Sequence, residues 1–166
     1  MRDTGSTGEA GEGTRSADPL ETAERLERMA RAREHVVSFT VPGVPVPQGS
    51  KSVDRRGNMY EANKGLKVWR GLVKDVARMK YSGPPLDGPV MIAAVFSMPR
   101  PKRSKFKLYP AGKPDTDKLQ RAVGDSLTAA GVLSDDARVV LWLAGKVWAD
   151  PADTGAALSV YSLGPA

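Results

Sequence analysis

After residue 34, runs of apolar residues mark the positions of the predicted strands. A β-branched run over residues 35–43 predicts a first strand, and a longer apolar run over 89–98 predicts a central strand buried on both faces. Two further runs, 138–148 and 156–163, predict strands that pair as an antiparallel hairpin across the turn-forming segment between them. The pattern therefore predicts a small sheet built around the 89–98 strand.

Apolar residues at helical spacing predict two main helices. In residues 65–81 and 115–130 the apolar side chains fall on one face. The second helix has an aspartate at its expected N-cap and ends at Gly131, a residue suited to the left-handed conformation that stops helices. We expect an α/β (α+β) fold, in which one small domain holds a mixed sheet packed by these two helices.

The first 34 residues differ from the rest in composition. Residues 1–17 are rich in Gly, Ser, Thr and Glu and contain almost nothing that forms a core, so we expect them to be disordered. Residues 18–34 have a thin apolar stripe at helical spacing, which predicts a short helix outside the core. We therefore expect an N-terminal extension over residues 1–34 and a folded domain over 35–166.

Composition narrows the possible chemistry. The 166-residue chain has no cysteine and a single histidine, His35, which excludes thiolate sites and histidine-based metal clusters. No apolar run approaches the roughly 20 residues that span a bilayer, and the N-terminus lacks the order of a signal peptide. We expect a protein that stays in the cytoplasm and makes no membrane contact.

The net charge of +6 is unevenly distributed. Residues 1–34 carry six basic and eight acidic side chains, so the remaining residues hold a net charge of +8. A domain this basic favours a polyanionic partner such as nucleic acid. The densest basic stretch is the segment after the central strand, where no acidic residue intervenes. Its cations are Arg100, Lys102, Arg103, Lys105, Lys107 and Lys113.

Carboxylates flank the second main helix on both sides. Asp115 and Asp117 stand at its start, directly after the basic segment, and Asp135 and Asp136 follow its end. Asp136 can join the first pair only if the chain folds back along the helix. A cluster of this kind offers the oxygen ligands that Mg²⁺ prefers, and bound Mg²⁺ activates phosphodiesters.

Simpler interpretations of these residues stay open. A D-x-D at a helix start is also typical of capping, and a D-D after a serine is typical of a turn. Arg121 lies four residues from both Asp117 and Asp125, which suits either a surface ion-pair ladder or a cation that offsets charge on a phosphate. Lys118 lies on a neighbouring face, where it can reach a DNA backbone.

The segment KPDTDKLQRAVGDSLTAAGVLSDDARVV resembles the signature of the RusA family of Holliday junction resolvases. That signature has a D-x-D-N-L entry to a helix, a basic residue four after the second aspartate, a D-[SA]-L later in the helix, and a D-D before a strand. The matching residues, in order and spacing, are Asp115, Asp117, Leu119, Arg121, Asp125, Leu127, Asp135 and Asp136. The resemblance extends more loosely over about residues 36 to 163.

The resemblance implies a Mg²⁺-dependent endodeoxyribonuclease, with Mn²⁺ as a possible substitute. Asp115, Asp117 and Asp136 take the place of the family's metal-binding carboxylates, and Arg121 stands where the family often has a catalytic lysine. Lys118 replaces the family's asparagine. The family acts as a homodimer that cuts four-way junctions with paired symmetric incisions in recombination and repair, often in phages and prophages, which places this chain in the cytoplasm of a bacterial host.

Two other functions are compatible with these residues. A related nuclease that prefers flaps or forks would use the same carboxylates on another branched DNA. A non-catalytic DNA-binding protein with a decayed site would explain Lys118, and its binding would weaken with salt.

Overall fold

The computed structural model describes residues 19–49, 51–53, 59–61 and 65–164. The chain forms two compact units, Met1–Arg31 and Ala32–Ala166. The predicted disorder of residues 1–17 lies outside the described residues. The predicted N-terminal helix is present as α1 (Pro19–Arg31), with exposed ion pairs of 3.6 Å between Glu24 and Arg28 and between Glu27 and Arg31. These i,i+4 pairs support the helix on its own surface.

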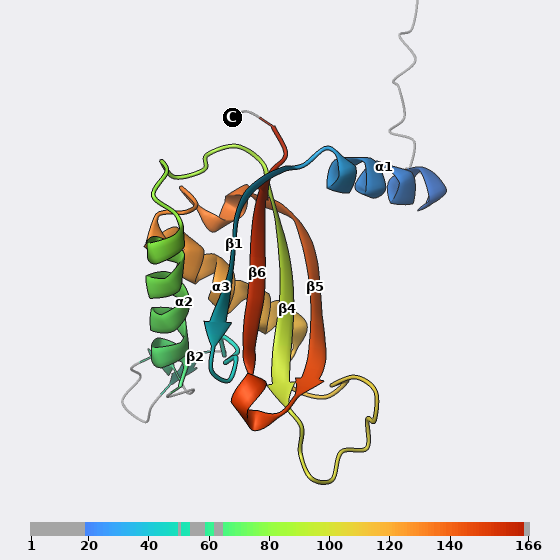
Figure 1. The fold of residues 1–166 in the computed structure, drawn as a ribbon, viewed down its shortest axis with the longest axis vertical. Coiled ribbons are helices and arrows are strands. Elements are labelled where there is room, and N and C mark those ends of the chain that lie inside the picture. The colour runs from blue at the N-terminus through green and yellow to red at the C-terminus, as the bar shows by residue number, and fades with distance from the viewer. Residues whose placement is uncertain (1–18, 50, 54–58, 62–64, 165–166) are drawn as a thin grey trace, which may run out of the picture. The chain divides into compact units, whose positions relative to one another are not determined.

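The second unit contains a mixed four-stranded sheet, as predicted. Its order is β1-β6-β4-β5. The strands are β1 (Glu34–Pro42), β4 (Val90–Pro99), β5 (Val139–Ala149) and β6 (Gly155–Ser162). β4 and β5 run parallel, and the other neighbours run antiparallel (Figure 1). A separate pair of short strands, β2 (Lys51–Val53) and β3 (Met59–Glu61), was not predicted.

The predicted hairpin between the last two strands is wrong. β4 lies between β5 and β6 and pairs with both over almost its full length. The apolar residues of β4 explain this order, because Ile92 and Phe96 are fully buried and an interior position gives them neighbours on both sides. The segment that was expected to be a hairpin turn, which includes the short 3-10 helix η2 (Pro151–Asp153), instead carries the chain past β4.

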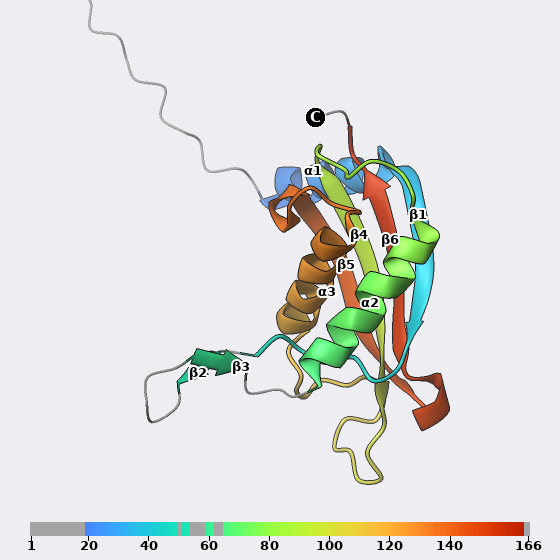
Figure 2. The ribbon, with the colours of Figure 1, turned by 90° about the vertical axis from the view of Figure 1, so that its left-hand side faces the viewer.

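Two helices cover one face of the sheet. α2 (Leu66–Lys80) contacts β1, α3 (Thr116–Ala130) contacts β5, and the helices contact each other (Figure 2). α3 supplies the crossover that joins the parallel strands β4 and β5. Both predicted main helices are thus confirmed, and none of the helices in the described part of the chain is long and apolar enough to cross a membrane.

Candidate active site

α3 is the element on which the site is built. Its buried face packs into the core through Leu119, Ala122, Val123 and Leu127, each 0% exposed. That packing fixes the rotation of the helix, so Asp117 and Arg121 remain exposed along one edge. Together with Gly124 they line a cavity of about 410 Å³ between α3 and the start of β5. The remaining lining residues are Gln120, Asp136, Val139 and Trp142.

Asp136 reaches this cavity because the chain reverses after α3. Gly131 adopts a left-handed conformation (φ +80°) and ends the helix, as predicted, and Leu133 is then buried. Asp135 accepts a hydrogen bond of 2.7 Å from the Ala137 backbone N–H and caps the short 3-10 helix η1 (Asp136–Arg138). The Asp136 side chain lies against Gly124, where an added Cβ would stand 3.6 Å from the Asp136 Cβ. The predicted fold-back along the helix is therefore present.

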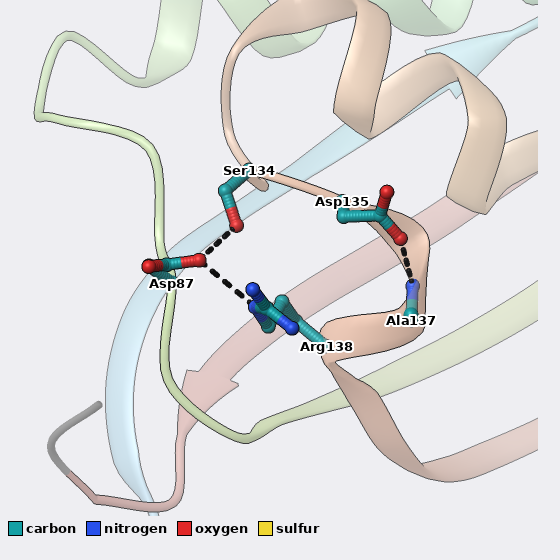
Figure 3. Close-up of polar contacts among 5 residues, drawn as sticks. All are labelled: Asp87, Ser134, Asp135, Ala137 and Arg138. Carbon is teal, nitrogen blue, oxygen red and sulfur yellow. Dashed lines mark hydrogen bonds and ion pairs between the residues drawn. The ribbon is translucent and has the colours of Figure 1, made fainter.

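A polar clamp holds the reversal in place. The Asp87 carboxylate accepts a hydrogen bond of 2.5 Å from the Ser134 hydroxyl and one of 2.9 Å from Arg138 Nε (Figure 3). The Leu86 backbone N–H donates to the Val132 carbonyl, and the Ser134 backbone N–H donates to the Leu86 carbonyl, both at 2.9 Å, which joins the same two segments. Ser134 and Arg138 lie on either side of Asp136, so the clamp fixes the segment that carries this carboxylate.

The clamp predicts a pH-dependent loss of stability in Asp87→Asn. The pKa of Asp87 is lowered, first by the hydrogen bond from Ser134 and then by Arg138. A lowered folded-state pKa gives stability that is present above the ordinary aspartate pKa of 3.8 and is lost as pH falls through the folded pKa. Thermal unfolding should show a lower midpoint for the variant at neutral pH, and the difference should vanish in strong acid.

Asp153→Asn is the matched control for this prediction, because Asp153 is exposed in η2 and lies at the other end of β5. An equal effect of both substitutions at neutral pH, or a difference for Asp87→Asn that persists in acid, would contradict a role for the clamp.

Negative charge gathers around Asp136. Its pKa is raised, first by partial loss of hydration and then by the like charges of Asp125 and Asp135, although the residue as a whole remains exposed. Asp125 is compensated by Arg70 of α2, with 3.5 Å between Arg70 Nη1 and a carboxylate oxygen. The ion-pair ladder considered for Arg121 is not formed, because no carboxylate among the described residues lies within ion-pair distance of it.

Asp115 is directed elsewhere. It is the N-cap residue of α3 but makes no side-chain capping hydrogen bond. Its carboxylate instead pairs with Lys118 Nζ at 3.2 Å and lines a neighbouring cavity of about 570 Å³. Within the described ranges, no three Asp, Glu or His side chains are grouped closely enough to bind one metal ion. The structure thus brings Asp117, Arg121 and Asp136 together, and the convergence of Asp115 with them stays a prediction.

The basic segment between β4 and α3 is a loop anchored at several points. Trp148 Nε1 donates to the Phe106 carbonyl at 3.1 Å, and Lys146 Nζ donates at 2.7 Å to each of the carbonyls of Gly112 and Pro114. The six predicted DNA-binding cations of the loop are all exposed, whereas Lys118 is half-buried. Sequence reasoning missed the anchors from β5, because nothing local in the sequence links a lysine to a loop 32 residues earlier.

Comparison with known proteins gives one family. A family model described as endodeoxyribonuclease RusA matches residues 42–156, which is more than half of the chain. The matched segment runs from the end of β1 to the start of β6 and includes every residue that lines the cavity beside α3. No curated protein matches the chain.

Proposed function

The chain belongs to the RusA family of endodeoxyribonucleases, and we propose that it cuts four-way (Holliday) DNA junctions with the help of Mg²⁺ bound at Asp117 and Asp136. The observation that carries this proposal is the shared cavity beside α3, where two carboxylates from separate segments lie with one exposed arginine. The simpler roles left open for these aspartates, helix capping and turn formation, do not require carboxylates from separate segments to share one cavity.

The donor set fits Mg²⁺. This ion keeps several waters and is usually bound by one or two carboxylates together with substrate phosphates, so a cage of three protein ligands is not needed. The pKa of Asp136 is raised first by partial loss of hydration and then by the negative charges of Asp125 and Asp135, and a bound cation would offset that repulsion. Mn²⁺ suits the same oxygen ligands. When bound, the ion polarises the phosphodiester and lowers the pKa of the attacking water.

Residues of the chain perform the remaining tasks. Asp117 and Asp136, which line the same cavity, would hold the ion, and Arg121 in that lining would offset the charge that develops on the phosphate. The family resemblance assigns Asp115 as a third ligand. In this structure its carboxylate pairs with Lys118 and lines the neighbouring cavity, so it would have to turn toward the cavity beside α3 to take that role.

The basic loop would hold the DNA backbone. Each phosphate contact releases counterions, so the logarithm of affinity falls with the logarithm of salt concentration by roughly 0.9 per contact. Replacing both Lys105 and Lys107 by glutamine should therefore reduce that slope by about 2. Junction binding measured over a series of salt concentrations tests this. Lys80→Gln on α2 is the matched control, and an unchanged slope in the loop variant would exclude these lysines from the interface.

The family resemblance also leads us to propose a homodimer, acting in the cytoplasm of a bacterial host on phage or prophage DNA. Two symmetric sites would place paired incisions in strands of like polarity. Sedimentation of the protein alone and bound to a junction tests the oligomeric state.

Cleavage of a synthetic four-way junction with mapped incision sites tests the function. We expect paired, symmetric cuts with Mg²⁺ or Mn²⁺ and none with a chelator. Faster cutting of flaps or forks than of the junction would favour the related branched-DNA nuclease. Binding without cleavage under any metal would favour a non-catalytic DNA-binding protein.

A further inference from the structure

Two adjacent residues of the basic loop, Leu108 and Tyr109 (the loop tip), expose large apolar side chains. Leu108 is 82% exposed, more than any other large hydrophobic residue in the described part of the chain, and the adjacent Tyr109 is 67% exposed. Contact with water is unfavourable for apolar surface, and a contiguous exposed apolar patch is typical of an interaction site. The loop that carries them extends beyond the end of the sheet (Figure 2).

The loop is held on both sides of this tip. Before it, Trp148 donates to the Phe106 carbonyl and an Arg100 guanidinium nitrogen donates to the Lys107 carbonyl at 3.2 Å. After it, the Ala111 backbone N–H donates to the Tyr109 carbonyl at 2.9 Å, and Lys146 holds Gly112. The exposure of the tip is therefore a consequence of how the loop is anchored.

Charge indicates that the partner of the tip is polyanionic. Arg103, Lys105 and Lys107 are exposed beside it, and residues 100–114 contain no acidic side chain. An apolar tip with cationic flanks fits DNA, in which phosphates surround the aromatic faces of bases. An anionic membrane offers a similar combination, but the roots of the loop line the cavity that holds Asp115, next to the proposed reaction site. This position favours DNA.

We propose that Leu108 and Tyr109 enter the branch point of the junction and contact nucleobases that have lost a stacking neighbour. Apolar side chains separate base steps in several DNA-binding proteins, and aromatic side chains stack on unpaired bases. The cost of unstacking is lowest where pairing is already interrupted, so the tip selects branched over continuous DNA. This inference rests on the proposed function and adds a substrate-selecting element to it.

Binding of junctions that carry 2-aminopurine tests the inference. The base fluoresces more strongly when it is unstacked, and it is placed either at the branch point or within one duplex arm. Measurements in a chelator keep the DNA intact. With the unmodified protein we expect a change in fluorescence at the branch point and none in the arm. Tyr109→Ser and Leu108→Ser should abolish that change and weaken junction binding roughly 5- to 100-fold, with duplex affinity unchanged.

Two controls separate stacking from other effects. Tyr109→Phe keeps the ring and should behave as the unmodified protein does. Met79→Ser removes an equally exposed apolar side chain from α2 (76% exposed) and should change nothing.

Three results would overturn the inference. Normal junction cleavage and an unchanged branch-point signal in the serine variants would reject the tip contact and leave the proposed function intact. Absence of any junction binding or cleavage by the unmodified protein would reject both. Binding to vesicles of phosphatidylserine in place of DNA, lost in the serine variants, would assign the tip to a membrane surface.

Discussion

Replacing Asp117 with asparagine is expected to lower junction cleavage by about 1,000-fold while junction affinity stays within a few-fold. Asparagine keeps the shape of the side chain but removes the negative charge that would hold Mg²⁺ in the cavity beside α3. The contacts with the DNA backbone that we propose for the basic loop are unchanged by this substitution. The substitution also removes a favourable charge from the first turn of α3, a small effect on stability because the residue is exposed.

Single-turnover cleavage and junction binding, measured on the same preparation, test this prediction. Asp75→Asn is the matched control, because Asp75 is an exposed aspartate on α2, away from the cavity. Cleavage by Asp117→Asn at the rate of the control would remove this carboxylate from the reaction. A parallel loss of binding would show that Asp117 acts in substrate recognition.

Replacing Asp136 with asparagine is expected to remove cleavage to a similar extent and, unlike most substitutions, to raise stability at neutral pH. The pKa of Asp136 is raised by partial loss of hydration and by Asp125 and Asp135, so the ionised carboxylate is disfavoured in the folded state. A raised folded-state pKa means that the contribution of this carboxyl to stability is greatest below the ordinary aspartate pKa of 3.8 and is lost as pH rises through the folded pKa. Asparagine does not ionise and avoids this loss.

Thermal unfolding without divalent ions, at neutral pH and again near pH 3, tests the stability half of this prediction. The variant should have the higher midpoint at neutral pH, and the difference should shrink in acid. Added Mg²⁺ should raise the midpoint of the unmodified protein and have less effect on the variant. A lower midpoint for Asp136→Asn at neutral pH would show that this carboxylate stabilises the fold.

The main helices and the strands of the four-stranded sheet could be predicted from local patterns, whereas the pairing of the last two strands could not. Leu119, Val123 and Leu127 recur at helical spacing and Gly131 stops the helix, so α3 follows from the sequence alone. The hairpin prediction for β5 and β6 failed because adjacency in sequence favours pairing only when no better neighbour exists. β4 is such a neighbour, and its Ile92 and Phe96 gain burial from a strand on each side.

For the candidate site, too, the local features could be predicted and the long-range contacts could not. The residue types at 115, 117 and 136 indicated carboxylate chemistry, and the reversal after Gly131 could be anticipated. The Asp115 side chain points toward Lys118, with which it forms an ion pair. The sequence could not predict this, because an exposed carboxylate has several possible partners. Arg70 pairs with Asp125 and Asp87 with Arg138 across 55 and 51 residues, respectively, and no local pattern links such partners.

Anomalous diffraction from crystals of the protein soaked in Mn²⁺ tests the central claim most directly. We predict a peak in the cavity beside α3, about 2.2 Å from carboxylate oxygens of both Asp117 and Asp136. A peak bound at Asp115 without these two residues, or no peak at a concentration that supports junction cleavage, would contradict a shared metal site in this cavity.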